Sequence, residues 1–348
     1  MTFDVERRSL GDVDLLTLRA GSLRAEVLTH GAHLVGLWAP DRIGRVDNVV
    51  VSLRHPGGEV DVDAYRDPTR NPHLGGMVGR YANRIAGASF ELDGATHELV
   101  PNEGPNQLHG GPLGFDRREW VWSAIDGDGD DAGVVLRLRS DDGDQGFPGR
   151  VDVQVTYRLT ASGELHIDVE GVTDAPTVLN VTNHSYWNLA GTSSAGADAT
   201  IRSHRLSVAA DRVVGVDGTL LPTGELIPVE GSVVDLRAPV ALGELLDRSE
   251  LRAVGGLDHC YVLDGGDPAA ELVDPGSGRR IRLSTDQPGV QVYTANHGAG
   301  PLPRHAAVCL ETQHLPDSPN QPGFPSAVLR PGATYRHTHV VRVDVVDR

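Results

Sequence analysis

The chain contains no lysine, and all 31 of its basic residues are arginine. This absence excludes a lysine side chain as a Schiff-base former or as a general base. Cysteine is scarce as well, with only Cys260 and Cys309 among 348 residues. Because two cysteines cannot build a disulfide scaffold in a chain of this length, we expect reduced thiols in a cytoplasmic protein.

Long apolar runs are also missing. No stretch of about 18 apolar residues occurs, so we expect no transmembrane helix. The first eight residues lack the apolar segment of a secretory signal. The formal net charge is −17, which disfavours nucleic acid and an anionic membrane surface, since both attract basic proteins.

What the chain has in quantity is alternation of apolar and polar residues, which is typical of strands with one buried face. The alternation is clearest over residues 134–139, 151–159, 165–170 and 335–346, and turns rich in glycine, aspartate and proline separate such segments. The one helix that we expect is short, over residues 242–246. This pattern predicts an all-β fold, a large antiparallel β-sandwich with very little helix. Without a linker-like stretch or a regular repeat, one domain over residues 1–348 is the simplest organisation.

The segment from Leu179 to Gly191 is the most informative part of the sequence. It places His184 among amide, hydroxyl and aromatic side chains, a composition that indicates a site for a small polyhydroxylated molecule and a proton transfer. Glu311 lies far downstream, in the sequence Glu-Thr-Gln-His, and supplies a carboxylate. A histidine and a carboxylate acting on one substrate suffice for paired acid and base catalysis.

Three further motifs carry hydrogen-bonding side chains. Asn83 and Arg84 lie near the end of the segment 79–85, where they could donate to sugar hydroxyls or form a surface ion pair. His109 ends a loop rich in proline and glycine, where glycines could let the backbone approach a ligand or the histidine could cap a turn. Asp258 precedes an apolar strand and could accept from sugar hydroxyls.

Metal binding has little support in the sequence. His259 and Cys260 suggest zinc, but a structural zinc site needs four ligands at compact spacings and no Cys-x-x-Cys pair occurs. His337 and His339 share one face of a strand and could join His314, yet we expect them on a solvent-exposed face. We expect neither a metal nor another cofactor.

Taken together, these segments closely resemble the aldose 1-epimerase (galactose mutarotase) family. The matching pieces span residues 75–335: Gly-Arg-Tyr-Ala-Asn-Arg-Ile (79–85), Asn-Gln-Leu-His-Gly-Gly (106–111), Gly-Phe-Asp (114–116), Asn-His-Ser-Tyr-Trp-Asn-Leu (183–189), Leu-Asp-His (257–259), Pro-Gly-Val-Gln-Val-Tyr-Thr (288–294), Glu-Thr-Gln (311–313) and Pro-Asp-Ser-Pro-Asn-Gln-Pro (316–322). Any one piece is a weak signal, but several in order are a strong one.

The resemblance implies a β-sandwich with an open sugar-binding cleft and an enzyme, without a cofactor, that interconverts the α and β anomers of free aldoses such as glucose and galactose. By position, His184 matches the family's general acid and Glu311 its general base. The positions that match sugar-binding residues are Asn83, Arg84, His109, Asp258 and Gln291. The implied partner is the sugar alone, and the implied assembly is a monomer or a homodimer.

Four departures from the family pattern leave these groups in place but put the preferred sugar in doubt: Trp187, Cys260, His297 and His314. Rival readings are a sugar-phosphate 1-epimerase, which needs extra arginines, and a non-catalytic carbohydrate-binding module, which needs no proton-transfer groups. A glycoside hydrolase using Asp258 and Glu311 would leave His184 idle.

Overall fold

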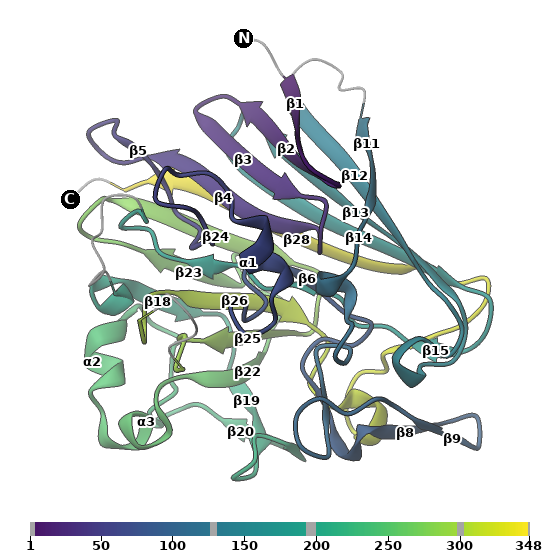
Figure 1. The fold of residues 1–348 in the computed structure, drawn as a ribbon. Helices are drawn as coiled ribbons and strands as arrows, with labels where there is room; N and C mark the ends of the chain where they lie inside the picture. Colours follow the sequence, from purple (N-terminus) through teal and green to yellow (C-terminus); the bar gives the residue numbers. More distant parts are fainter. Residues whose placement is uncertain (1–3, 126–130, 193–199, 298–302, 347–348) are drawn as a thin grey trace.

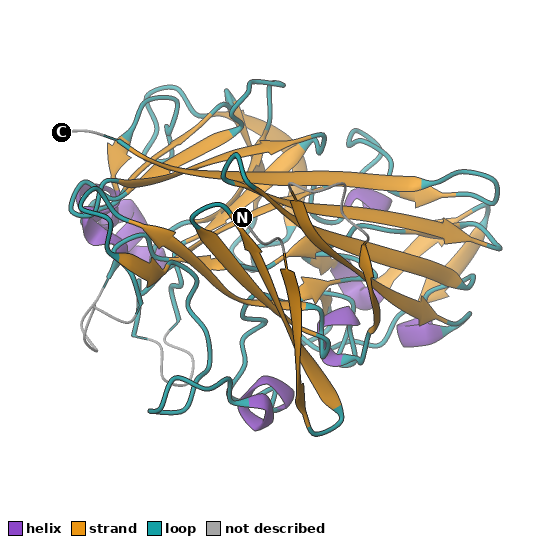
Figure 2. Cartoon of the chain, turned by 90° about the horizontal axis from the view of Figure 1, so that it is seen from above, coloured by secondary structure: helices purple, strands orange, loops and turns teal. Residues whose placement is uncertain are grey.

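The computed structural model describes residues 4–125, 131–192, 200–297 and 303–346. Strands dominate the described residues and the helices are short (Figure 2). The helices are α1 (Val62–Arg66), α2 (Leu242–Leu246) and α3 (Ser249–Val254), with 3-10 turns η1 (Ala86–Ala88), η2 (Phe115–Arg117), η3 (Asp144–Gly146), η4 (Ile201–Ser203) and η5 (Ser318–Asn320). The expected helix over residues 242–246 is α2. None of these helices is long and apolar enough to cross a membrane.

Three antiparallel sheets form the body of the molecule (Figure 1). The first follows chain order: β1 (Asp4–Leu10), β2 (Val13–Ala20), β3 (Leu23–Leu28), β4 (His33–Pro40), β5 (Val46–Asn48). The second has the order β11 (Val121–Ile125), β12 (Asp131–Ser140), β13 (Val151–Thr160), β14 (Glu164–Thr173), β28 (Tyr335–Val345), β24 (Arg279–Thr285), β23 (Ala270–Val273), β18 (Arg205–Val208), β21 (Val240–Ala241). The third has the order β17 (Tyr186–Trp187), β26 (Val308–Gln313), β25 (Gly289–Tyr293), β22 (Asp258–Val262), β19 (Arg212–Val216), β20 (Pro222–Pro228).

Short strand pairs connect these sheets. They are β7 (Arg84–Ile85) with β10 (Gln107–Leu108), β6 (Met77–Val78) with β16 (Thr182–Asn183), β15 (Thr177–Val178) with β27 (Val328–Leu329), and the hairpin β8 (Ser89–Leu92) with β9 (Ala95–Glu98). The hairpin turns at Asp93 and Gly94, both with positive φ, as a tight two-residue turn requires.

The expected alternation builds one large core. In β13 the burial alternates residue by residue, with Val153, Val155 and Tyr157 buried. The inward side chains of all three sheets join one cluster that runs from Leu16 to Val343. The expectation of a large antiparallel β fold with very little helix is therefore confirmed, and both cysteines are free and buried.

The expected exposure of His337 and His339 is wrong. Both lie on the inward face of β28 and are 2% exposed. Between the two sheets, the Thr312 hydroxyl of β26 lies 2.7 Å from His337 Nε2 and 2.8 Å from His339 Nδ1. The pair shares a face, as the spacing predicted, but that face packs on β26 through a polar contact.

Candidate active site

Three of the expected site residues lie on one face of the six-stranded sheet, where adjacent strands carry them. Asp258 is on β22, Gln291 on β25 and Glu311 on β26, and Gln291 stands directly opposite Glu311 in the ladder. Gln291 Nε2 donates to Asp258 Oδ1 at 2.6 Å. Because side chains alternate along a strand, neighbours such as Val292 and Leu310 point into the core instead.

His184 lies between β16 and β17 and faces the same region. Its backbone N–H donates to Gly76 O and its carbonyl accepts from the Gly75 N–H, so the backbone that carries the ring is held in place. The Nε2 atom is 3.6 Å from Glu311 Oε2, and the Tyr186 ring stacks on the imidazole at 5.0 Å. The two groups expected to act as acid and base are therefore close neighbours.

His109 is fixed by the segment that contains Asn83. The His109 N–H donates to Asn83 O, and the Asn83 N–H donates to His109 Nδ1 at 3.2 Å. Since a backbone N–H can only donate, Nδ1 is the acceptor and Nε2 carries the proton. A Cβ on Gly110 would lie 1.9 Å from Gly79 O. The absence of a side chain at Gly110 therefore lets its backbone pack against the backbone of Gly79, whereas the sequence suggested that glycines here would let a ligand approach.

Arg84 forms the ion pair that the sequence left open, and it also lines the pocket. Its guanidinium binds Glu103 through two hydrogen bonds, of 2.8 and 2.7 Å, and this ion pair forms part of the pocket wall. Arg80, from the same motif, is 2% exposed and donates to the carbonyls of residues 140, 141, 148 and 149. It serves the fold and does not line the pocket.

One pocket of about 280 Å³ brings all seven predicted residues together: Asn83, Arg84, His109, His184, Asp258, Gln291 and Glu311. This volume lies just below the usual range for ligand sites and suits a single sugar ring. The pocket also contains side chains that the sequence did not single out for a role: Pro72, His73, Glu103, Leu108, Tyr186, Leu220, Tyr293, Ala295 and His297. Leu108, Tyr186 and Tyr293 lie within the matching motifs but were given no role, whereas residues such as His73 and Glu103 lie outside every motif and become neighbours only in the folded chain.

Burial shifts the protonation of the central pair in opposite directions. Burial, and then the charge of Asp258, raise the pKa of Glu311 well above its ordinary value. Burial, and then His73, lower the pKa of His184 to about 3. Both shifts favour the uncharged forms, a protonated Glu311 and a neutral His184, so the pair shares one proton in the free enzyme. Moving that proton from Glu311 to His184, whose facing atoms are 3.6 Å apart, gives the carboxylate and the imidazolium that act as base and acid.

Among the described residues, one group of side chains has metal-ligand spacing: His109, His184 and Glu311, with ligand atoms within 4.8 Å of one another. The chemistry of His109 does not fit a metal. Its Nδ1 accepts the Asn83 N–H, so Nε2 keeps its proton and offers no lone pair. The remaining two ligands fall short of the three protein ligands of a catalytic zinc site.

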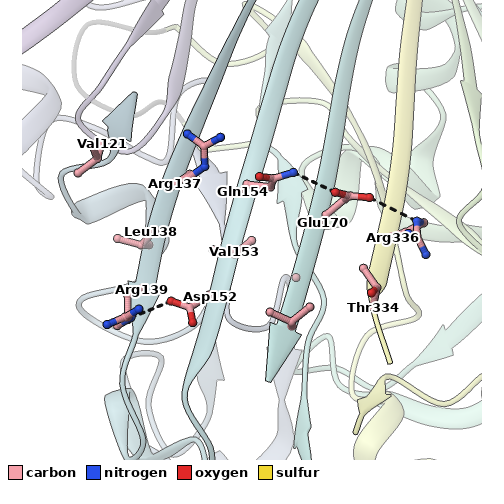
Figure 3. Close-up of a pocket in the computed structure, with 12 residues that line it drawn as sticks. Val121, Arg137, Leu138, Arg139, Asp152, Val153, Gln154, Glu170, Thr334 and Arg336 are labelled. Atoms are coloured by element: carbon pink, nitrogen blue, oxygen red, sulfur yellow. Dashed lines mark hydrogen bonds and ion pairs between the residues drawn. The ribbon is translucent and has the colours of Figure 1, made fainter. Parts of the chain in front are cut away.

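A larger hollow, of about 650 Å³, lies on the outer side of the nine-stranded sheet (Figure 3). Most of its charged side chains are paired, Arg139 with Asp152 at 2.7 Å and Glu170 with Arg336, while Gln154 donates to Glu170 and Arg137 donates to Ser123. The lining contains no histidine and no cysteine. Despite its size, it lacks the histidine beside a carboxylate that the smaller pocket has.

Comparisons with known proteins agree with this geometry. A sequence model of the family "Aldose 1-epimerase" matches residues 14–342. Human galactose mutarotase is 39% identical over 94% of this chain and 93% of its own, and aldose 1-epimerase of Escherichia coli K12 is 36% identical over 92% of each. The crystal structure of galactose 1-epimerase from Lactobacillus acidophilus superposes with a TM-score of 0.85, at 26% identity and 99% coverage of both chains.

Proposed function

The chain belongs to the aldose 1-epimerase family, and from that premise we propose how its pocket converts one anomer of a free aldose into the other. The enzyme is an isomerase of the mutarotase type. Its reaction opens the pyranose ring and closes it on the opposite face of C1. The observation that carries the proposal is the contact between His184 and Glu311, 3.6 Å apart on the wall of a pocket of sugar size.

In the proposed mechanism, Glu311 removes the proton from the C1 hydroxyl while His184 protonates the ring oxygen. The C1–O5 bond breaks and leaves an aldehyde, which rotates about the C1–C2 bond. The two proton transfers then run in reverse as the ring oxygen attacks the other face. No atom is gained or lost, so the two side chains return to their starting states.

The other five predicted residues would hold the sugar in place. His109 presents its Nε2–H as a donor, and Gln291 and Asp258 form a linked amide and carboxylate on the sheet. Arg84 and Asn83 complete the wall beside them. Fixing the sugar in this way brings C1 and the ring oxygen to Glu311 and His184 and removes the entropic cost of a chance encounter.

A sugar phosphate is a weaker candidate for the substrate. Arg84 is the only arginine among the described residues that line the pocket, and Glu103 already occupies both arms of its guanidinium. A phosphate prefers a free bidentate arginine and would have to displace that carboxylate.

We also propose that the whole chain forms one domain and works in the cytoplasm as a monomer or a homodimer. The shared core from Leu16 to Val343 supports one domain. The two free, buried cysteines are consistent with a reducing compartment.

Polarimetry of freshly dissolved α-D-glucose and α-D-galactose tests the function. We expect the wild-type protein to accelerate mutarotation of at least one sugar, and Glu311→Gln and His184→Gln each to lower kcat by about 10²- to 10⁴-fold, as loss of a general acid or base does. Circular dichroism of each variant should match the wild type. Near-normal turnover in either variant would refute its assigned role, and no acceleration by the wild type would refute the reaction itself.

A further inference from the structure

His73 is a pocket residue that neither the motifs nor the proposed mechanism uses. It lies in the loop between α1 and β6, and its side chain is 22% exposed. Its ring is nearly parallel to that of His184, with centroids 5.9 Å apart, and is 4.8 Å from that of His109. Three imidazoles therefore share one wall of the sugar pocket.

A buried carboxylate fixes the orientation of His73. Asp116, in η2, is 1% exposed, and its Oδ2 lies 2.8 Å from His73 Nδ1. Burial alone would raise the pKa of Asp116, but His73 and Arg117 hold it well below its usual range. Because an ionised carboxylate can only accept, His73 Nδ1 carries the proton and donates it.

Asp116, which holds Nδ1, is not among the described residues that line the pocket, so Nε2 is the ring nitrogen left to face it. Nε2 makes no hydrogen bond with any residue that the structure describes, whereas Nδ1 is bound to the interior. His73 lines the same pocket as His184 and Glu311. A histidine held by a buried carboxylate through one nitrogen presents the other in a defined direction, as in catalytic triads.

The loop itself is built to hold this ring. The Tyr186 hydroxyl donates to Pro72 O at 3.0 Å, and the Leu74 N–H donates to Asn71 Oδ1 at 2.8 Å. His73 has a φ of 65°, a left-handed conformation that is uncommon for a residue other than glycine and that clusters at functional sites. A surface loop without a role would need neither this conformation nor these bonds.

We infer that His73, oriented by Asp116, is a specificity-determining residue that binds one hydroxyl of the sugar through Nε2. This inference rests on the proposed function and adds a contact to it. Since Nδ1 is the donor to Asp116, Nε2 is the nitrogen that meets the hydroxyl, which can donate to it or accept from it. The choice among aldoses then depends in part on whether a hydroxyl stands at that position.

Two substitutions separate the nitrogen that faces the pocket from the one that faces Asp116. In His73→Asn the amide takes the place of Nδ1, so the bond to Asp116 can persist while the pocket atom is lost. In His73→Gln the amide reaches the place of Nε2, so the pocket contact can persist while the bond to Asp116 is lost. Asparagine also tolerates positive φ, which limits the effect on folding.

The measurement is kcat/KM by polarimetry for the better of D-glucose and D-galactose and for its 2-, 3-, 4- and 6-deoxy derivatives. We expect His73→Asn to lower kcat/KM about 10-fold for the parent sugar, as the loss of one hydrogen bond predicts. For the one deoxy sugar that lacks the bound hydroxyl, wild type and His73→Asn should have nearly equal values. His73→Gln should lose less than His73→Asn on the parent sugar.

A wild-type to His73→Asn ratio that is the same for all five sugars would overturn the inference, because a purely structural role affects every substrate alike. His73→Gln being worse than His73→Asn would also overturn it, since the Asp116 bond would then be the important one. In both cases the mutarotase function would stand. A wild-type enzyme that accelerates none of the sugars would overturn the function and, with it, this contact.

Discussion

Two carboxylates, the half-buried Asp258 and the buried Glu311, lie on neighbouring parts of one sheet face, and only Glu311 is assigned a proton transfer. Gln291 donates to Asp258, whereas Glu311 Oε2 is buried and has no hydrogen-bond partner. An unpartnered buried carboxylate oxygen is costly in an empty site. A sugar hydroxyl in the pocket would relieve that cost, so the same atom that destabilises the free enzyme is suited to act on substrate.

The charge of Asp258 should set part of the pH dependence. Above the raised pKa of Glu311, the pair of Glu311 and His184 has lost its one proton and no acid remains, so kcat/KM should fall as pH rises through that pKa. Asp258 is the second cause of that rise, after burial. Asp258→Asn should therefore move the alkaline limb of the kcat/KM profile to lower pH, whatever it does to the maximal rate. The control is Glu103→Gln, which removes a rim carboxylate; an equal shift in both variants would show that general charge, not Asp258, sets the pKa.

At this scale, the sequence predicted what lies within motifs. All seven predicted residues line one pocket. They could be predicted because motif spacing and family resemblance can both be recognised in the sequence without knowledge of the fold. His73 and Glu103 could not be predicted, since their neighbours Asp116 and Arg84 are 43 and 19 residues away. Only the folded chain shows that these pairs meet.

At the scale of elements, β26 has two faces with different tasks. Glu311 faces the pocket, while the next residue, Thr312, faces β28 and its two histidines. A slip of one residue in the register would exchange these faces. The polar contact of Thr312 therefore helps to fix the register that points Glu311 at the pocket.

This contact gives a stability prediction. Thr312→Val keeps the shape of the side chain but leaves His337 Nε2 and His339 Nδ1 without their partner, which should lower the free energy of unfolding by about 1–3 kcal/mol. Thr312→Ser keeps the hydroxyl and removes one methyl, at about 1 kcal/mol. Urea unfolding at pH 7 would compare the two. A serine variant less stable than the valine variant would mean that packing, not hydrogen bonding, dominates at this position.

Alternation predicted the long strands β12, β13, β14 and β28 well, because each buries one face over many residues. It could not predict their order. β28 pairs with β14 and β24, although it lies at the far end of the chain from β14. The prediction that His337 faces solvent was wrong for the same reason. Two polar residues on one face of a strand indicate an exposed face unless the sheet that packs against them is known.

At the scale of the whole molecule, the interior holds several histidines that are buried in the neutral state. Burial lowers the pKa of His204 and His337 to about 4, and of His33, His184 and His339 to about 3. The unfolded chain binds a proton on each near pH 6.5. Between those values the unfolded state holds more protons, so stability is present above pH 6.5 and is lost as pH falls toward 4.

The size of this loss is large relative to the stability of a typical domain. Each such histidine contributes a slope of about 1.3 kcal/mol per pH unit near pH 5, and folded proteins are stable by only about 5–15 kcal/mol. The net charge of −17 opposes the trend, because acidification reduces repulsion among carboxylates. We expect the histidines to prevail, since several buried groups act together whereas exposed charges are screened by salt.

The test is the slope of unfolding free energy between pH 7 and pH 5, measured with urea. His204 is fully buried, and its Nε2 accepts the Leu189 N–H at 2.9 Å. His204→Gln should be less stable at pH 7 but should lose stability less steeply on acidification, by about 0.9 kcal/mol per pH unit averaged over this range. His55, whose side chain is 56% exposed, provides the matched control, and His55→Gln should keep the wild-type slope. If the two variants had equal slopes, protonation of His204 on unfolding would not contribute to the acid sensitivity. The sensitivity would then be assigned to the carboxylates.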